Sequence, residues 1–198
     1  MVVPLRVLRQ RVAGLDLGPD QRRQMLARQF FPHVPATPPA FLAVSRPYHG
    51  PVMVIEERAA GDPGLAALLD AAFAELVARY GPEGRSGVHE RARFLVARVG
   101  DEAVGCGAVQ PAEPGVAELK RMYVAPAFRG RGIARGLLAA LEDLARAMEY
   151  RALRLATGLK QPEAIALYES SGYTLTPPYG KYVRQPATRC YLKELARC

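Results

Sequence analysis

Metal-binding and disulfide-forming residues are scarce in this sequence. Its 198 residues include no tryptophan, three histidines and three cysteines. Cys106, Cys190 and Cys198 are too few and too far apart for a disulfide framework, and they form no CxxC pair or Cys/His spacing typical of zinc sites. The sequence also lacks a run of roughly 18 apolar residues that would span a membrane, and its first residues do not form a secretory signal. We therefore predict a cytoplasmic protein with no metal centre and no membrane segment.

Positive charge exceeds negative charge, but unevenly along the chain. The net charge of +8 comes from 27 Lys and Arg against 19 Asp and Glu. The first 50 residues hold seven Arg and two Asp, which gives this segment +5 and leaves +3 for the rest. Arg outnumbers Lys 23 to 4, as the coding bias of a GC-rich genome would produce. The charge therefore does not establish a polyanion partner. We do not favour a nucleic acid as a partner, although nucleic-acid binding through the basic N-terminal arm stays an alternative.

Residues 1–51 are predicted to be an irregular extension before a domain over residues 52–198. Seven of the 17 prolines fall in the first 50 positions, where they interrupt the hydrophobic pattern and remove backbone donors. Residues 19–31 form at most a short helix. The basic, amphipathic residues 2–12 are either a targeting or membrane-surface segment or a tail without function. Translation that starts at Met53 would be another explanation of the extension.

From residue 52 onward, the hydrophobic pattern alternates between strand and helix periods. Asp62 followed by Pro63 is a typical helix start, and apolar residues then recur every three or four positions until Gly81. Two strand-like runs joined by a short turn predict a hairpin. The expected strands are 52–56, 93–99, 103–110, 116–124, 153–156, 173–175 and 188–192, and two more helices are expected from Ile133 to Met148 and from Pro162 to Ser171. This order predicts a mixed α/β (α+β) domain with one central β-sheet flanked by helices.

A glycine-rich turn lies between the last strand of this hairpin region and the helix that starts near Ile133. Gly130 and Gly132 allow the backbone to approach a ligand closely, and the helix N-terminus offers unpaired N–H groups. Three arginines add positive charge to the turn, namely Arg129, Arg131 and Arg135. This combination suits an anion of the size of a pyrophosphate.

Other glycine motifs do not fit this turn. Counting from Gly130, a Rossmann fingerprint would need glycine at Arg135, and a Walker loop would need Gly-Lys-Ser/Thr. An Arg-Gly tract that binds RNA is disfavoured because apolar helical periodicity follows at once. A purely structural turn remains the alternative to an anion site.

Two separated motifs resemble those of the GNAT superfamily of N-acetyltransferases. They are Arg129-x-x-Gly132-x-Ala134, preceded by Met-Tyr-Val-x-Pro, and Ala164-x-x-Leu167-Tyr168-x-x-x-Gly172-Tyr173. With the hairpin and the first helix, the resemblance covers about residues 52–195. It implies a GNAT-like fold and a transferase of the acyl-CoA-dependent acyltransferase class. It further implies acetyl-CoA as the acyl donor and no metal.

The resemblance also indicates which residues would contact acetyl-CoA. In the family, the strand before the turn separates from its neighbour and binds the pantetheine arm and the thioester through its backbone. The matching positions are Met122, Tyr123 and Val124 for this arm and Arg129, Gly130, Arg131, Gly132, Ile133, Ala134 and Arg135 for the pyrophosphate. Gln161 stands where the family often has an asparagine that binds the CoA arm, and its side chain is one methylene longer.

Two residues match catalytic positions of the family. Tyr168 matches the tyrosine that commonly protonates the departing CoA thiolate, and Glu118 matches a general base that acts directly or through water. An amine must lose a proton before it attacks a thioester, so a carboxylate near the acyl carbon suits the chemistry. Strand alternation places Glu118, Lys120 and Met122 on one face. Glu118 therefore either shares a cleft with Lys120 or forms an exposed ion pair with it. Tyr168 is either the acid or a packed helix residue.

The expected reaction is direct transfer of an acetyl group from acetyl-CoA to a primary amine in a ternary complex. We expect the acceptor to be a small-molecule or protein amine. The segment 177–182 resembles a substrate-side loop of some small family members. Its Tyr179, Lys181 and Tyr182 either line the acceptor pocket or belong to a proline-stiffened turn. A non-catalytic acyl-CoA-binding regulatory protein is the alternative function, and the sequence leaves a homodimer open.

Overall fold

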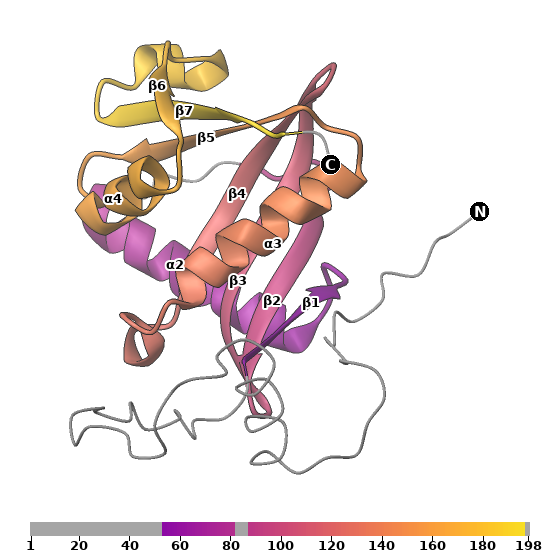
Figure 1. Cartoon of the computed structure of the whole chain (residues 1–198). Coiled ribbons are helices and arrows are strands. Elements are labelled where there is room, and N and C mark those ends of the chain that lie inside the picture. The colour runs from indigo at the N-terminus through magenta and orange to yellow at the C-terminus, as the bar shows by residue number, and fades with distance from the viewer. Residues whose placement is uncertain (1–52, 82–86, 197–198) are drawn as a thin grey trace, which may run out of the picture. The chain divides into compact units, whose positions relative to one another are not determined.

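The computed structural model describes residues 53–81 and 87–196 (Figure 1). The predicted extension over residues 1–51, with its short helix and its basic stretch, lies outside the described residues. The strands are β1 (Met53–Arg58), β2 (Arg93–Val99), β3 (Glu102–Glu113), β4 (Val116–Val124), β5 (Ala152–Gly158), β6 (Thr174–Thr176) and β7 (Thr188–Glu194). The α-helices are α2 (Pro63–Tyr80), α3 (Ile133–Ala147) and α4 (Pro162–Ser170), and the 3-10 helices are η2 (Pro126–Phe128) and η3 (Gly180–Arg184).

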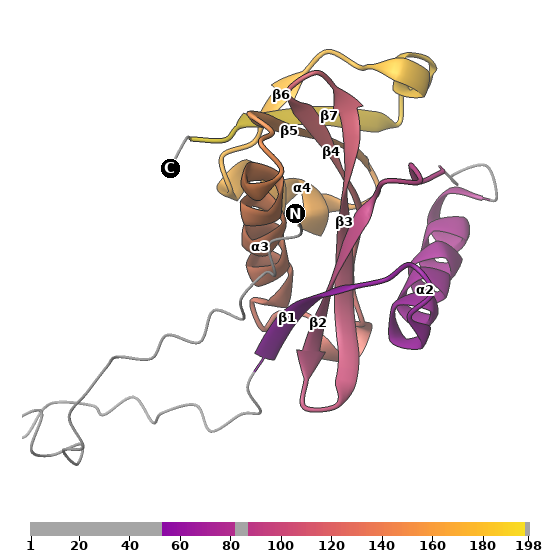
Figure 2. The ribbon, with the colours of Figure 1, turned by 90° about the vertical axis from the view of Figure 1, so that its right-hand side faces the viewer.

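One mixed sheet of seven strands runs through the described chain in the order β1-β2-β3-β4-β5-β7-β6. β4 and β5 are parallel, and the other neighbours pair antiparallel. Figure 2 shows α2 on one face of the sheet and α3 and α4 on the other. The predicted fold class, a mixed central sheet flanked by helices, is confirmed.

The helix α2 begins and ends where its flanking residues predict. The Asp62 carboxylate accepts a hydrogen bond of 2.9 Å from the Leu65 N–H, and Pro63 occupies the first turn, where a missing N–H is harmless. Gly81 follows the last turn with a φ of 79°, a conformation that favours glycine. These local signals fix both ends of α2.

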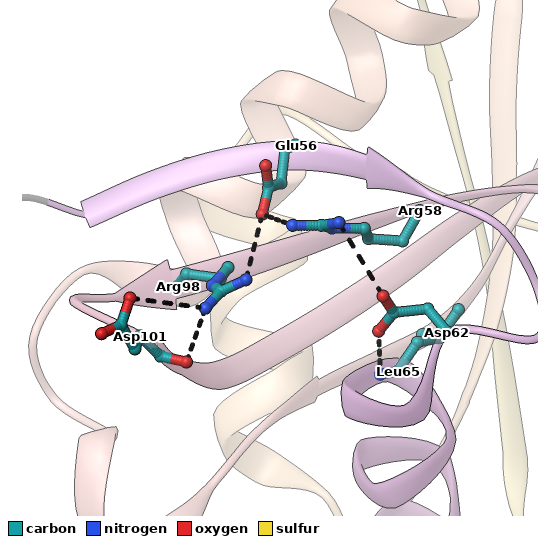
Figure 3. Close-up of polar contacts among 6 residues, drawn as sticks. All are labelled: Glu56, Arg58, Asp62, Leu65, Arg98 and Asp101. Carbon is teal, nitrogen blue, oxygen red and sulfur yellow. Dashed lines mark hydrogen bonds and ion pairs between the residues drawn. The ribbon is translucent and has the colours of Figure 1, made fainter.

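A cluster of charged side chains ties the start of α2 to β1 and to the β2–β3 hairpin (Figure 3). Glu56 on β1 pairs with Arg58 and with Arg98, and Arg58 lies 3.9 Å from Asp62. Arg98 also reaches Asp101 in the hairpin turn. These groups are partly exposed, so solvent screens the ion pairs and each contributes little to the free energy of unfolding. The cluster therefore orients α2 more than it stabilises the fold.

Apolar side chains fill both faces of the sheet. The face of α3 that packs on the sheet carries Leu137, Leu138, Leu141 and Leu144, each at most 3% exposed, so the predicted apolar face of this helix is confirmed. The smaller cluster on the α2 face consists of Leu65, Leu68, Phe94, Val96, Cys106 and Ala108. Full burial of one such side chain contributes about 1.5–3 kcal/mol. β4 therefore lies between two packed layers that hold its backbone in place.

β3 is longer than predicted, because it continues through Pro111 to Glu113. The register between β3 and β4 shifts between Pro111 and Glu113. Proline is tolerated within a strand at such an irregularity because no ladder hydrogen bond is needed from its nitrogen. The turn of this hairpin consequently lies at Pro114 and Gly115.

A β-bulge in β4 changes which of its side chains share a face. Cys106 pairs with Tyr123 and Ala108 with Lys120, so two residues of β4 lie opposite Gly107 alone. Arg121, in this bulge, has a φ of 58°.

The bulge makes one sequence expectation wrong. Met122 packs against the core under α3, whereas Tyr123 packs against the core under α2. Lys120 faces the α2 side because its partner Ala108 belongs to the cluster there. The predicted common face of Glu118, Lys120 and Met122 therefore breaks after Lys120, since the bulge inserts one residue into the alternation.

Candidate active site

β4 and β5 separate from each other and open a cleft in the sheet. They pair only over Val116–Glu118 with Ala152–Arg154, and the described residues beyond these make no further pairs between the two strands. β5 instead follows β7 as far as Gly158. The β5-facing backbone groups of β4 after Glu118 therefore have no strand neighbour and are available to a ligand. The cleft has a volume of about 590 Å³, and α2, β4, β5, Gln161, Tyr168 and the 181–188 segment line it.

Glu118 lies behind the lining of this cleft as part of a buried polar network. Its carboxylate accepts hydrogen bonds of 3.2 Å from Gln110 Nε2, Lys120 Nζ and the Tyr179 hydroxyl. The side chains of Glu118 and Lys120 are each only 9% exposed, so the ion pair is buried and not exposed as one alternative had it. Lys120 lines the cleft, and Glu118 lies behind it. Burial of a carboxylate requires such partners, because an unpaired buried charge is strongly unfavourable.

The segment predicted to approach the acceptor packs on this network. Tyr182 accepts a hydrogen bond of 3.2 Å from Lys120 Nζ, and its ring meets the Tyr179 ring edge to face at 5.3 Å. The Arg154 guanidinium lies over the Tyr179 ring, 4.0 Å from its centre. Burial, and then the charge of Glu118, raise the pKa of Tyr179, so its hydroxyl stays protonated and donates to the carboxylate. Lys181 and Tyr182 line the cleft, whereas Tyr179 does not line it and donates its hydrogen bond to Glu118.

Tyr168 both packs in the core and lines the cleft. It is 6% exposed, and its ring meets Tyr173 edge to face at 5.8 Å and lies 6.4 Å from Tyr191. Burial raises the pKa of its hydroxyl. The hydroxyl therefore remains protonated and can donate a hydrogen bond within the cleft. The two alternatives for Tyr168, acid and packed residue, are compatible in this geometry.

The glycine turn exposes the N-terminus of α3. Gly130 and Gly132 have φ values of 73° and 81°, in the left-handed region where glycine is favoured. The first helical hydrogen bond runs from the Gly136 N–H to the Gly132 carbonyl. The N–H groups of Ile133, Ala134 and Arg135 precede that bond, so they are the donors that a helix leaves unpaired. Together with the helix dipole they form an environment that suits a phosphate oxygen.

The Arg129 side chain is held by neighbouring elements. Its Nη2 lies 2.6 Å from Glu75 Oε2 on α2, and its Nε donates to the Val124 carbonyl at 2.9 Å. Glu75 also pairs with Arg79 at 2.6 Å. The hydrogen bond from Arg129, followed by the charges of both arginines, lowers the pKa of Glu75 against the opposing effect of burial. Arg129 therefore links the phosphate turn to α2.

The other predicted contacts flank the same region. Arg131 Nη2 donates to the Ala127 carbonyl at 3.0 Å, and Arg135 Nη2 lies 3.3 Å from Ser170 Oγ on α4. Gln161 lines the cleft at the start of α4, and its side chain makes no capping hydrogen bond to the helix. The structure thus gathers the predicted CoA-contacting residues around the end of β4 and the starts of α3 and α4.

Sequence reasoning missed the role of the end of α2. The Tyr80 hydroxyl accepts a hydrogen bond of 2.8 Å from the Lys160 N–H, and Arg79 Nη1 donates to the Lys160 carbonyl at 3.0 Å. The Tyr80 ring lies so close to Gly158 that a Cβ there would overlap it. Gly158 is the residue in the sequence that could have indicated this contact, since a glycine in a strand often marks the close approach of another part of the chain. Because Glu75 binds Arg129 and Tyr80 binds Lys160, α2 spans the cleft from the glycine turn to the end of β5.

The described part of the chain contains neither a membrane-spanning helix nor a group of metal-ligating side chains. No helix there is long and apolar enough to cross a membrane. Nor do three or more His, Cys, Asp or Glu side chains gather there in a way that would hold a metal ion.

Two parallel strands that separate beside a glycine turn and a helix N-terminus match the arrangement that the GNAT resemblance implies. The model of the GNAT acetyltransferase family matches residues 64–173, and the chain belongs to this family. The family resemblance found in the two motifs is thereby confirmed.

Individual relatives agree with this assignment. The chain is 47% identical over 95 residues to an IAA acetyltransferase of Azospirillum brasilense, an alignment over 48% of this chain and 62% of the relative. It thus spans less than two thirds of that relative's length. A crystal structure from Klebsiella pneumoniae, classed with the acyl-CoA N-acyltransferases, is 34% identical with a TM-score of 0.64, covering 73% of this chain and 98% of that one. An Elizabethkingia anophelis family member with acetyl-CoA bound is 23% identical with a TM-score of 0.56, over 72% and 98% of the two chains, and shares the fold.

Proposed function

We propose that the protein is an N-acetyltransferase that transfers the acetyl group of acetyl-CoA to a primary amine. The observation that carries this proposal is the separation of β4 from β5, which leads directly into the glycine turn and the N-terminus of α3. An extended thioester arm would find unpaired backbone groups along β4, and its pyrophosphate would find unpaired N–H groups at the helix. The binding of acetyl-CoA by the Elizabethkingia anophelis protein supports this assignment.

The donor would contact the residues that the family motif indicates. In this proposal the backbone of Met122, Tyr123 and Val124 holds the pantetheine arm, and the segment from Arg129 to Arg135 holds the pyrophosphate. Gln161 lines the cleft beside this arm. A backbone N–H of β4 directed at the thioester oxygen would stabilise the oxyanion, and such a donor contributes about 10²–10³ in rate.

Proton transfer is assigned to two residues, Glu118 behind Lys120 and Tyr168 in the lining of the cleft. The attacking amine loses its proton to Glu118 through a bridging water, because Lys120 lies between this carboxylate and the cleft. The carbon–sulfur bond of the thioester then breaks as the new carbon–nitrogen bond forms. Tyr168 donates its hydroxyl hydrogen to the departing thiolate. Direct attack in a ternary complex needs both substrates together, and the cleft opens along β4 for the donor and beside η3 for the acceptor.

Calorimetric titration of acetyl-CoA tests the donor site. Gly132→Asp places a carboxylate and a strained backbone where the pyrophosphate would bind, so we expect affinity to fall by at least about tenfold, equivalent to about 1.4 kcal/mol. Gly100→Asp is the matched control, because Gly100 also has a positive φ, 60°, and open space around it, but lies in the β2–β3 turn. Equal affinity of the two variants would refute the donor site.

A non-catalytic acyl-CoA-binding regulator is the second candidate. The observation in its favour is that the Glu118 carboxylate already receives three hydrogen bonds and does not line the cleft. Binding of acetyl-CoA without release of free CoA thiol, for every amine tested, would favour this candidate over the enzyme.

A further inference from the structure

Tyr179 is held in place through both its backbone and its ring. Its carbonyl accepts a hydrogen bond of 3.0 Å from the Tyr182 N–H, and its own N–H donates to the Cys190 thiol on β7. The Tyr182 ring meets the Tyr179 ring edge to face at 5.3 Å, and the Arg154 guanidinium lies 4.0 Å from the centre of the Tyr179 ring. Packing and hydrogen bonds on several sides lock a side chain in one rotamer. The Tyr179 hydroxyl therefore has a defined position before any substrate binds.

Arg154 on β5 gives up a hydrogen bond in this arrangement. Its guanidinium pairs with the exposed Glu113, while its Nε is buried and has no hydrogen-bond partner among the residues that the structure describes. An arginine stacked on an aromatic face gains a cation–π attraction, which offsets part of that loss. Arg154 therefore holds the Tyr179 ring against the buried polar network of Glu118.

The Tyr179 hydroxyl donates to the same carboxylate oxygen that Lys120 contacts. Both reach Glu118 Oε1 at 3.2 Å, whereas Gln110 Nε2 reaches Oε2. Gln110 is itself fixed, because its Oε1 accepts a hydrogen bond of 3.0 Å from the His89 N–H. Donors from β3, from β4 and from the segment before η3 therefore hold one carboxylate. Among them, the Tyr179 hydroxyl can be removed without removing a charge.

The titratable and charged groups that face Glu118 and Tyr179 come from four elements. They are Lys120 on β4, Arg154 on β5, Cys190 on β7, and Lys181 and Tyr182 on η3. Burial, and then the charge of Glu118, raise the pKa of Tyr179, while Arg154 acts in the opposite direction. The hydroxyl therefore stays protonated over the whole range in which a carboxylate titrates. It donates more strongly to the charged carboxylate than to the neutral one, so it favours the charged form.

From this arrangement we infer that Tyr179 is a positioning residue of the acetyl transfer. Its hydroxyl holds the Glu118 carboxylate in one orientation and in its charged form, so that the carboxylate can take the proton of the acceptor amine through water. The inference rests on the proposed acetyltransferase function and adds a residue to the same site. Tyr179 does not line the cleft, so it acts through Glu118 rather than on a substrate.

Tyr179→Phe tests this role, because it removes the hydroxyl and keeps the ring that Arg154 and Tyr182 contact. The measurement is the pH profile of kcat for the full chain, with saturating acetyl-CoA and the most reactive amine from a panel of primary alkylamines, arylalkylamines and amino acids. We expect the acidic limb, where the base takes up a proton, to move to higher pH by about one unit, since the charged carboxylate loses a donor. On the plateau, kcat should fall by up to about tenfold, because the base is held less firmly in the reactive geometry.

Tyr191→Phe is the matched control. It removes a hydroxyl that donates to a different carboxylate, Glu169, at 2.8 Å, and neither of these two residues lines the cleft. This variant should keep the acidic limb of the wild type. A limb that moves equally in Tyr191→Phe and Tyr179→Phe would overturn the inference.

The profile of Glu118→Gln separates this inference from the proposed function. If Glu118→Gln changes the profile but Tyr179→Phe keeps the wild-type limb, or loses kcat equally at every pH, the inference is overturned and the acetyltransferase function stays intact. An unchanged profile in Glu118→Gln would overturn the base assignment and the inference together. Release of no thiol with any amine of the panel would overturn the proposed function and this inference with it.

Discussion

At the scale of single residues, the chemistry of Glu118 depends on its neighbours more than on its place in the sequence. Its carboxylate is buried and receives hydrogen bonds from Gln110, Lys120 and Tyr179. These contacts hold the carboxylate behind Lys120, which lines the cleft. In the proposed mechanism, a base held in this way would act on a substrate proton through water.

Glu118→Gln should lower kcat by about 10²-fold or more, because the amide cannot accept the proton of the amine. The loss should be greatest below the pKa of the amine, where most of the substrate is protonated. A pH–rate profile of the variant against the wild type measures this effect. An unchanged profile would remove Glu118 from the base role.

Glu142→Gln controls for the loss of a buried ion pair. Glu142 is 6% exposed and pairs with Lys193 at 2.7 Å, away from the residues that line the cleft. Both variants remove the partner of a lysine, Lys120 at 9% exposure and Lys193 at 24%, so Glu118→Gln should lose more stability, about 3–5 kcal/mol at most. Only Glu118→Gln should change the pH–rate profile of the folded enzyme.

At the scale of elements, the bulge of β4 positions the backbone that lines the cleft. It depends on Gly107, because a Cβ at this position would lie 2.8 Å from Met122 Sδ and also overlap Leu141. Overpacking of this kind typically costs about 1–3 kcal/mol, because side chains and backbone must shift to make room. The absence of a side chain at Gly107 therefore lets α3 pack closely on the sheet and lets the β4 backbone that lines the cleft keep its position.

Gly107→Ala should lower the free energy of unfolding by about 1–3 kcal/mol and weaken acetyl-CoA binding, since the β4 backbone must move. Urea denaturation and calorimetry measure the two effects. Gly61→Ala is the control, because a Cβ at Gly61 meets no atom within 4 Å. A Gly107→Ala protein with unaltered stability and affinity would contradict this role of the bulge.

The elements themselves could be predicted because their signals are local. Asp62, Pro63 and Gly81 bound α2 through contacts within a few residues, and the apolar face of α3 follows from its own periodicity. The bulge could not be predicted, because it depends on the register between β3 and β4. Without it, Met122 was assigned to the wrong face.

At the scale of the whole molecule, the site depends on contacts between distant parts of the chain. Tyr179 reaches Glu118 across 61 positions, and Arg129 reaches Glu75 across 54. Such pairs leave no periodic signal in the sequence. The family resemblance indicated Glu118 and Arg129, and the 177–182 segment indicated Tyr179. The contacts of Glu118 with Tyr179 and of Arg129 with Glu75 emerged only from the fold.

Buried tyrosines should make the fold sensitive to alkaline pH. Burial raises the pKa of Tyr168, Tyr173 and Tyr179, and it raises the pKa of Cys106 to about 12. In the unfolded chain these groups lose their protons near pH 10 for tyrosine and about 8.5 for cysteine. Above those values the unfolded state binds fewer protons than the folded state, so stability falls as the pH rises.

Urea denaturation from about pH 8 to pH 11 measures this dependence, with an expected loss of up to about 1.4 kcal/mol per pH unit for each group that titrates. Tyr173→Phe removes one of these groups and should make the loss shallower. Stability that stays constant or rises over this range would contradict the assigned burial effects.

The most direct test of the central claim is to quantify acetylated amine and free CoA together after incubation of the full chain with acetyl-CoA and a panel of amines. Mass spectrometry of the amine and a thiol assay supply the two quantities. The account predicts one acetyl amide for each thiol released. Acetyl-CoA that binds but yields neither product with any amine would contradict it.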